Sequence, residues 1–556
     1  MTGRLTAKAI QDRRRQIRGA RFYMRPPRLL SFRFIALSIL VSWLLLPLAD
    51  AAPAATSGMS GETSFERPRS NVAPPSIRGP RLSLSIREAV SIALARNFDI
   101  TIAGFDPDIA ESNVIRERSA FDPLAFVETN ASKSKLGAFV EGNERTREID
   151  SLGIAAGIRQ RIITGAEYSL ILRNLRESTN SQQSAFDPSF QTSLTFTIEQ
   201  PLLKNFGIDI NRARIKVAMA TKEQTLHAYR SRVIQTVDAV QQAYWNLVFS
   251  IENLQFRRKS LDLAKDLLRR NKIQVEVGTL APIEITEAEA TVASREEALL
   301  VAEREVKDRE DTLKMLLNVA EQPSAWGISI LPRDKPEFEV VQVDEMQLTL
   351  DALRKHAALE NARIEIDKRK IDMKVAGQNL LPEVNLSASA SNNALADNQG
   401  EAFEEQFKNE RYSFSGGVSF RIPIGNRQAE ADYRQAQLRH AKTVASYHQT
   451  QQAIMEEVRR NARRVRVNVK RIEATRVARR LAEERLDAQE KKFKVGLSTS
   501  RNILEDQERL ANALTEETRA LIDYHKSLAS LDRATHSTLE RFQIEMLYPG
   551  ETTAKK

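Results

Sequence analysis

The sequence predicts a mainly α-helical protein with a smaller β component, organised as a tandem repeat of long coiled-coil helical hairpins and β-hairpins. Three observations lead to this fold class. Apolar residues recur at every seventh position in two long segments, which is typical of coiled-coil helices. Two shorter segments alternate apolar and polar residues with the period of two that β-strands require. Short motifs of the first half also return in the second half at constant offsets, which indicates that one structural unit is duplicated.

The first repeat is predicted over residues 82–320. It opens with a helix that Ser85 can cap, because Glu88 follows three residues later as in a capping box. The helical pattern that follows has an interruption at the Asp106–Pro107 step, since proline lacks the backbone donor of a helix interior.

Strands are expected at about 124–200 of this repeat. Apolar residues alternate there in three runs: Leu152, Ile154, Ala156 and Ile158; Tyr168, Leu170 and Leu172; Leu194, Phe196 and Ile198. One apolar face per strand fits either a β-sandwich or a barrel whose outer face lies in lipid.

A helical hairpin is predicted at about 211–320. Its first arm carries an unbroken sevenfold apolar track: Leu226, Val233, Val240, Leu247, Leu254, Leu261, Leu268 and Val275. A helix over this track is roughly 75 Å long at 1.5 Å per residue. The turn contains Gly278 and Pro282, which end one helix and start another. The second arm continues the sevenfold spacing from Ile285 to Leu313.

The second repeat is predicted over 344–543, after a polar connector at 321–343. Ala352–Leu353 corresponds to Ala93–Leu94, and strand alternation returns at about 383–423. A second helical hairpin is expected at about 427–543. Its sevenfold track contains Val458, Val465, Ile472, Leu486 and Phe493 and is interrupted by Arg479.

The two strand regions differ in length. Pro123 and Pro201 are 78 positions apart, whereas Pro382 and Pro423 are 41 apart, so the first region has 37 additional residues (78 − 41). This is about the size of a hairpin at 151–175 with its loop.

The N-terminal segment 1–51 has the parts of a secretory signal peptide: a basic stretch, an apolar run from Phe34 to Leu48, and Ala49–Asp50–Ala51 as a small-x-small cleavage pattern. The alternative is a short retained membrane anchor. Residues 52–81 are rich in proline, serine and glycine and are expected to be disordered, and residues 544–556 form a tail. The chain contains no cysteine, so it has neither disulfides nor a thiol for lipid attachment.

The charge distribution argues against nucleic acid as a partner. The formal net charge is +10, but residues 1–51 hold ten Lys and Arg against two Asp, so the rest of the chain is near +2. The six histidines show no metal-binding spacing, and no phosphate-binding glycine loop or nucleophile motif is present. We therefore expect no catalytic residue, no cofactor and no metal site, and we expect a protein that is not an enzyme. The Tyr244–Trp245 pair is expected to pack in a core.

Several motifs resemble those of the TolC family of outer-membrane efflux and type I secretion channels. The stretches Leu84–Ala89 and Ala93–Asn97 are similar to the opening element of that family. Glu199–Leu202 and Arg421–Gly425 are similar to its two strand-exit elements, and both Val-Gly turns match its hairpin tips. The resemblance covers about 82–543.

The resemblance implies a homotrimer in the cell outer membrane with a large periplasmic portion. Strands from three chains would close one β-barrel, and the long helices would form a periplasmic α-barrel. The assembly would be a conduit for efflux of small molecules or drugs, or for type I protein secretion, docked to a periplasmic adaptor (membrane fusion) protein and an inner-membrane pump. Two strands per repeat would give twelve in the trimer; the extra first-repeat hairpin would either widen the barrel or form an external cap. The alternative from a different class is an exported periplasmic coiled-coil adaptor or structural rod without a barrel.

The resemblance also implies two groups of site residues. Acidic residues just after the Val-Gly turns close the periplasmic aperture in this family, and the corresponding positions here are Glu284, Asn502 and Glu505. The aspartate usual at one of them is Asn502 in this chain. The alternative is that these are ordinary solvated residues of a first helical turn. The adaptor-docking tips would be Val277, Gly278, Thr279, Leu280, Val495, Gly496, Leu497 and Ser498; the alternative is that these residues only end the helices.

Overall fold

The computed structural model describes residues 67–72, 81–140, 143–180, 184–319, 326–408, 410–495 and 497–546. The predicted signal peptide 1–51 and Gly496 of the second tip lie outside these residues. Everything described below lies within one compact unit, Phe65–Lys556.

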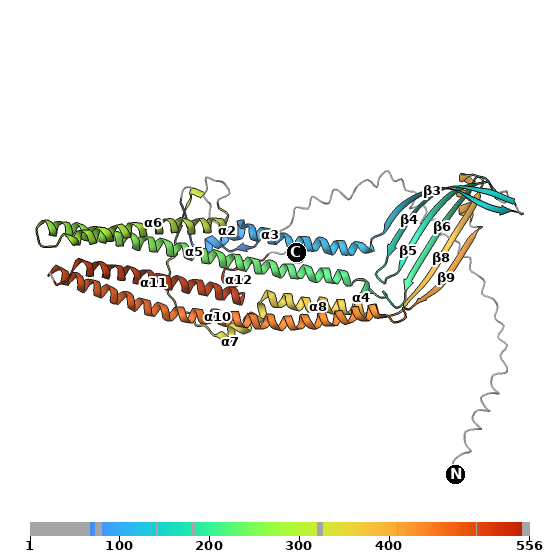
Figure 1. The fold of residues 1–556 in the computed structure, drawn as a ribbon. Coiled ribbons are helices and arrows are strands. Elements are labelled where there is room, and N and C mark those ends of the chain that lie inside the picture. Colours follow the sequence, from blue (N-terminus) through green and yellow to red (C-terminus); the bar gives the residue numbers. More distant parts are fainter. Residues whose placement is uncertain are drawn as a thin grey trace, which may run out of the picture. The chain divides into compact units, whose positions relative to one another are not determined.

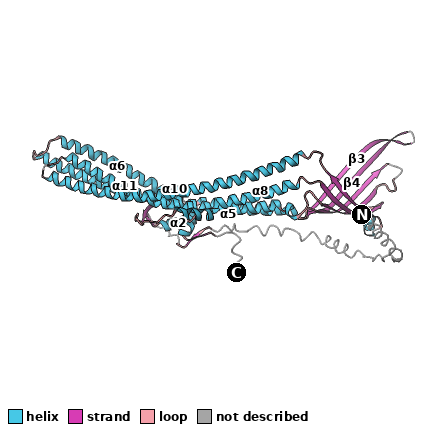
Figure 2. Ribbon diagram, turned by 90° about the horizontal axis from the view of Figure 1, so that it is seen from below, coloured by secondary structure: helices cyan, strands magenta, loops and turns pink. Residues whose placement is uncertain are grey.

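Two helical hairpins carry most of the fold (Figures 1 and 2). In the first, α5 (Ala213–Glu276) packs against α6 (Ile283–Leu317); in the second, α10 (Arg427–Lys494) packs against α11 (Ser500–Thr535). Helix α11 also packs against α5 and so joins the two hairpins.

The sevenfold apolar tracks lie in the cores of these hairpins. Val233, Val240 and Leu247 of α5 are fully buried, as are Val458, Val465 and Ile472 of α10. Arg479, which interrupts the second track, forms an ion pair of 2.9 Å with Glu517 on α11. A charged residue is therefore accommodated in this seam because the facing helix supplies its partner.

Shorter helices flank each hairpin in the same way. Helices α2 (Ile86–Arg96) and α3 (Phe98–Arg118) pack on α5, and α7 (Glu345–Lys355) and α8 (Ala357–Gln378) pack on α10. The capping box of Ser85 and Glu88 is present. The expected interruption at Asp106–Pro107 is not: α3 continues through Pro107, and the chain breaks instead at Asn97, whose side chain caps α3. A proline within a helix loses one hydrogen bond, and the packing of α3 against α5 offsets this loss.

All six long strands form a single antiparallel sheet in the order β3-β4-β5-β6-β8-β9. Their bounds are β3 Leu124–Val140, β4 Asn143–Arg161, β5 Glu167–Thr179, β6 Ser189–Pro201, β8 Glu383–Ala396 and β9 Tyr412–Arg421. The β4–β5 hairpin spans Asn143–Thr179, which is 37 residues (179 − 143 + 1) and equals the length difference between the repeats. The additional segment is thus an internal part of the sheet, placed between β3 and β6.

The two faces of this sheet differ in polarity. One row of paired residues crosses all six strands with apolar side chains: Ala125, Ile158, Leu170, Phe196, Ala390 and Phe414. The adjacent row, on the other face, is polar apart from its first member: Leu124, Arg159, Ser169, Thr197, Ser389 and Ser415. We call these the apolar face and the polar face. On the polar face, the hydroxyl oxygens of Ser389 and Ser415 are 2.7 Å apart.

The remaining described strands form small sheets. Strand β1 (Arg69–Ser70) pairs with β10 (Ile544–Glu545), and β2 (Arg81–Leu84) pairs in parallel with β7 (Ser329–Pro332). Segments predicted as disorder, connector and tail therefore contain short strands within the described residues. Helix α9 (Gln399–Lys408) packs on β6 and β8, while η2 (Ser119–Phe121), α4 (Ile208–Asn211) and α12 (Thr538–Arg541) are single turns.

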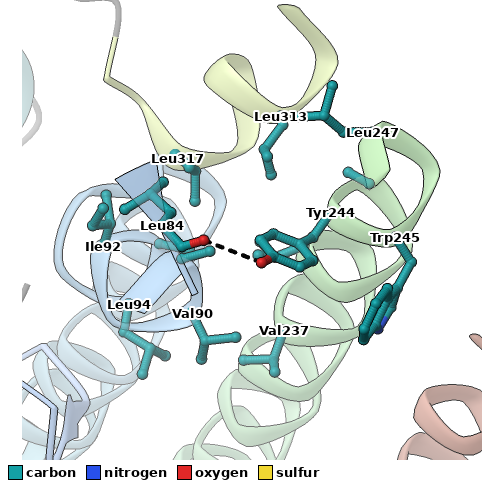
Figure 3. Packing of buried hydrophobic residues seen from close by; sticks show 14 of the residues in the cluster. Leu84, Val90, Ile92, Leu94, Val237, Tyr244, Trp245, Leu247, Leu313 and Leu317 are labelled. Carbon is teal, nitrogen blue, oxygen red and sulfur yellow. Dashed lines mark hydrogen bonds between the residues drawn. The ribbon is translucent and has the colours of Figure 1, made fainter. Parts of the chain in front are cut away.

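The largest core lies where α2, α5 and α6 meet these small strands (Figure 3). Tyr244 is fully buried at its centre, and its hydroxyl lies 2.7 Å from Oδ2 of Asp334 and 3.1 Å from the carbonyl oxygen of Leu84. Trp245 is also buried and stacks on His525 of α11 with ring centroids 4.3 Å apart. This core ties the connector after β7 to both hairpins.

Across the part of the chain described, no helix is both long enough and apolar enough to span a membrane.

Candidate functional site

The two hairpin tips lie together at one end of the helices (Figure 1). Ser500 at the start of α11 donates a hydrogen bond of 3.1 Å to Asn271 near the end of α5, and both side chains are buried. Beneath them, Leu267 of α5 packs against Leu486 of α10 and Ile503 of α11. The tips are therefore held in one place by contacts between the two repeats. Since α5 begins directly after the sheet region and ends at this tip, the tips and the sheet lie at opposite ends of α5.

The first tip is a regular helix end. Val277 is the C-cap of α5, and Gly278 follows with φ of +75°, a conformation that favours glycine. The backbone N–H of Thr279 donates to the carbonyl of Gln274 at 2.9 Å, and that of Gly278 donates to Val275 at 3.0 Å. These two bonds form a Schellman motif, so Gly278 and Thr279 have a role in ending the helix.

The second tip repeats this pattern. Leu497 donates its backbone N–H to the carbonyl of Lys492 at 2.9 Å, again across the C-cap residue, here Val495. Thr499 then caps α11 by accepting from the backbone N–H of Asn502, and Ser498 Oγ accepts from Gln489 at 2.6 Å. Helix-ending chemistry accounts for the polar members of both tips.

The requirements for ending a helix do not explain why the tips also carry exposed apolar side chains. The side chains of Val277, Val495 and Leu497 are 67%, 69% and 78% exposed, and Ile283 at the start of α6 is 61% exposed. Leu280 is half-buried and Thr279 exposed. Large apolar side chains from both turns are thus available at one end of the helical region.

The aperture candidates lie close to these tips but do not form one cluster. Glu505 is exposed and lies between two arginines of its own helix, with oxygen to nitrogen distances of 3.4 Å to Arg501 and 3.9 Å to Arg509. Asn502 is exposed one turn earlier. Glu284 is on α6, half-buried, and no hydrogen bond or ion pair joins it to Asn502 or Glu505 among the described residues. Glu505 is therefore an acid flanked by bases four residues before and after it on the same helix.

Two buried charged residues near the tips were missed by the sequence analysis. Asp506 has a side chain only 3% exposed and pairs with Arg485 of α10 at 2.9 Å and with Arg509 at 3.0 Å. Arg295 of α6 hydrogen-bonds to Ser260 of α5 and reaches the carbonyl of Leu504 on α11, and burial lowers its pKa. The spacing of Asp506 and Arg509 was visible in the sequence, whereas the partners on other helices depend on how the hairpins align.

No group of three or more histidine, aspartate and glutamate side chains is arranged to hold a metal ion in the described ranges.

Comparison with known proteins relates parts of both repeats to one family. The profile of the family described as "Outer membrane efflux protein" matches residues 171–319 and 348–536. The curated outer membrane protein TolC of Vibrio cholerae is 22% identical over 401 residues, which is 68% of this chain and 89% of the relative.

Solved structures share the fold. The CmeC outer membrane channel of Campylobacter jejuni superposes with a TM-score of 0.59 at 14% identity, covering 82% of this chain and 89% of that one. The outer membrane protein VceC of Vibrio cholerae gives a TM-score of 0.59 at 16% identity, covering 81% and 95%. The resemblance inferred from the motifs is confirmed: the chain belongs to the outer membrane efflux protein family and is an outer-membrane protein with a TolC-like fold.

Proposed function

We propose that three copies of this chain form a trans-periplasmic efflux conduit, with a β-barrel in the outer membrane and a helical tube in the periplasm. The observation that carries the proposal is the polarity of the six-stranded sheet, which has an apolar row on one face and a mainly hydroxyl-bearing row on the other. Outer-membrane barrels present an apolar band to lipid and a polar wall to the lumen.

The sheet also supports an assembly of several copies. Six strands are fewer than the eight of the smallest outer-membrane barrels, so a single chain does not supply a closed wall. Backbone groups of an open edge in lipid would lack partners, at a cost of several kcal/mol each. Copies of the same chain remove these edges by pairing with one another.

The exposed apolar residues of the tips support docking to a periplasmic adaptor, which would connect the conduit to an inner-membrane pump. Val277 and Val495 occupy equivalent places in the two repeats, and Leu497 lies beside the second. A partner that buried these side chains would gain roughly 1.5–3 kcal/mol for each one fully covered.

A substitution at the tip tests this docking. Leu497→Asp is expected to leave the amount of trimer in the outer membrane unchanged, because Leu497 has no buried contacts, and to abolish drug efflux and adaptor cross-linking. Met346→Asp is the matched control, since Met346 is 69% exposed on α7 and far from the tips in sequence. Full efflux by the Leu497 variant would contradict docking at the tips.

The same assay distinguishes cargo classes. Efflux of small molecules is the proposed activity, and accumulation of a fluorescent drug in cells lacking the protein tests it. Normal drug accumulation together with loss of an exported protein from the medium would favour type I secretion instead.

We also propose that Glu505 contributes to the periplasmic aperture. Three copies around a common axis would place three carboxylates in a ring, each paired with Arg501 and Arg509. The flanking arginines reduce the negative charge of such a ring, so its preference for cations is expected to be modest.

A further inference from the structure

The outermost strands of the six-stranded sheet, β3 and β9, each pair on one side only. Strand β3 is bonded to β4 and strand β9 to β8, and neither has a second strand partner among the described residues. Both edges carry exposed apolar side chains: Val127 on β3 is 71% exposed, and Phe414 and Val418 on β9 are 70% and 66% exposed. Long, unpaired edges of this kind are templates for pairing with another chain.

The directions of the strands make a second copy of the chain the fitting partner. Every neighbouring pair in the sheet is antiparallel, so with six strands β9 runs opposite to β3. The β3 strand of a second copy can therefore add to β9 as one more antiparallel strand. Because the apolar row includes Ala125 on β3 and Phe414 on β9, this addition can continue both faces of the sheet without changing their polarity.

The β4–β5 hairpin is a full part of the wall between these edges. All 17 residues of β3 pair with β4, 13 residue pairs join β4 to β5, and 11 join β5 to β6. A hairpin that formed an external cap would lose these backbone hydrogen bonds to β3 and β6. The hairpin also continues the polarity of both faces, with Ile158 and Leu170 in the apolar row and Arg159 and Ser169 in the polar row.

Resting on the proposed trimer, we propose that β9 of each subunit pairs with β3 of the next and that three copies close a barrel of eighteen strands. With strands about 4.8 Å apart and tilted by about 40°, eighteen strands give a backbone diameter of ~36 Å, against ~24 Å for twelve. The additional hairpin thus widens the outer-membrane section by about half.

Electron cryomicroscopy of the trimer extracted from the outer membrane tests this directly. The proposal predicts eighteen strands for the full chain and twelve for a variant lacking Asn143–Thr179, whose β3 would then pair with β6. A trimer of the full chain with twelve strands and the hairpin outside the wall would overturn this inference and leave the proposed function intact. The absence of any trimer in the outer membrane would overturn both.

The edge contact has its own test, because the chain contains no natural cysteine. Ser415→Cys on β9 is combined in turn with Glu128→Cys, Asn130→Cys or Ser132→Cys on β3, all on the polar face and all displaced along the strand as a tilted barrel requires. Oxidation is expected to link chains into dimers and trimers on a denaturing gel for at least one pair.

The matched control combines Ser415→Cys with Ser389→Cys. The hydroxyl oxygens of the two serines that are replaced lie 2.7 Å apart within one chain. This pair is expected to oxidise and leave chains unlinked. Linkage of chains by none of the three β3 positions, with normal oxidation of the control, would contradict the pairing of β9 with β3.

Discussion

An arginine placed on the apolar face should block membrane assembly, whereas an arginine one residue further along the same strand should not. Phe196 lies on the apolar face near the middle of β6, with Leu170 and Ala390 as its neighbours in the row, and its side chain is 42% exposed. Thr197 lies on the polar face between Ser169 and Ser389. Phe196→Arg and Thr197→Arg are therefore matched in position and differ in the face that receives the charge.

The expected magnitude follows from the position in the strand. Arginine facing lipid near the bilayer midplane costs about 2–4 kcal/mol, and a trimer carries the substitution three times, so the assembly loses about 6–12 kcal/mol. This is comparable to the whole stability of a typical domain, about 5–15 kcal/mol. An arginine in the lumen is solvated and should change stability by less than about 1 kcal/mol per subunit.

The assay is the amount of heat-sensitive trimer in the outer-membrane fraction, followed by its melting temperature in detergent. The Phe196 variant is expected to be nearly absent from this fraction and the Thr197 variant to assemble normally. Normal assembly of the Phe196 variant together with loss of the Thr197 variant would refute the assignment of the apolar face to lipid.

Three further predictions concern the helical region. Tyr244→Phe removes a buried hydroxyl that bonds a carboxylate, so it should lower the free energy of unfolding by about 2 kcal/mol and the melting temperature with it. Tyr412→Phe is the control and should have no effect, because Tyr412 is exposed. Equal melting temperatures of the two variants would contradict this. Hydrogen bonding to Arg333 lowers the pKa of Glu88 from 4.5 to about 2, so its contribution to stability is present above pH 4.5 and lost as pH falls toward 2. Glu88→Gln should therefore flatten the acid side of a stability profile, and an unchanged profile would count against the pair. Glu505→Ala should raise single-channel conductance and weaken block by divalent cations, and no change in either would remove Glu505 from the aperture.

Much of the helical architecture was predictable because its signal is local and long. The sevenfold track through Val233, Val240 and Leu247 predicted a helix whose seam is buried, and the structure places these residues in the core. The two Val-Gly turns were also predictable, because a helix that ends with a positive φ, as at Gly278, favours glycine at that position.

The arrangement of the strands was only partly predictable. Alternation assigned Ile158, Leu170 and Phe196 to one face of their own strands, and the pairing register brings all three into one row. This local pattern carries no information on the order of the strands in the sheet, so it could not distinguish a wider barrel from an external cap. The continuous sheet favours the first of these.

Contacts between elements that are far apart in the chain could not be predicted from the sequence. The pairing of β2 with β7 involves only four residues on each side, too few for a periodic signal. The ion pair of Asp506 with Arg485 depends on the alignment of two helices that only the fold sets. The continuation of α3 through Pro107 likewise depends on packing against α5, which overrides the local preference.

The most direct test of the central claim is the native mass of the protein extracted by detergent from the outer-membrane fraction. We predict a heat-sensitive species of three chains, after correction of the measured mass for bound detergent. A soluble periplasmic monomer or dimer would contradict it, and would mean that the six-stranded sheet forms no barrel and that the protein is an adaptor or a structural rod.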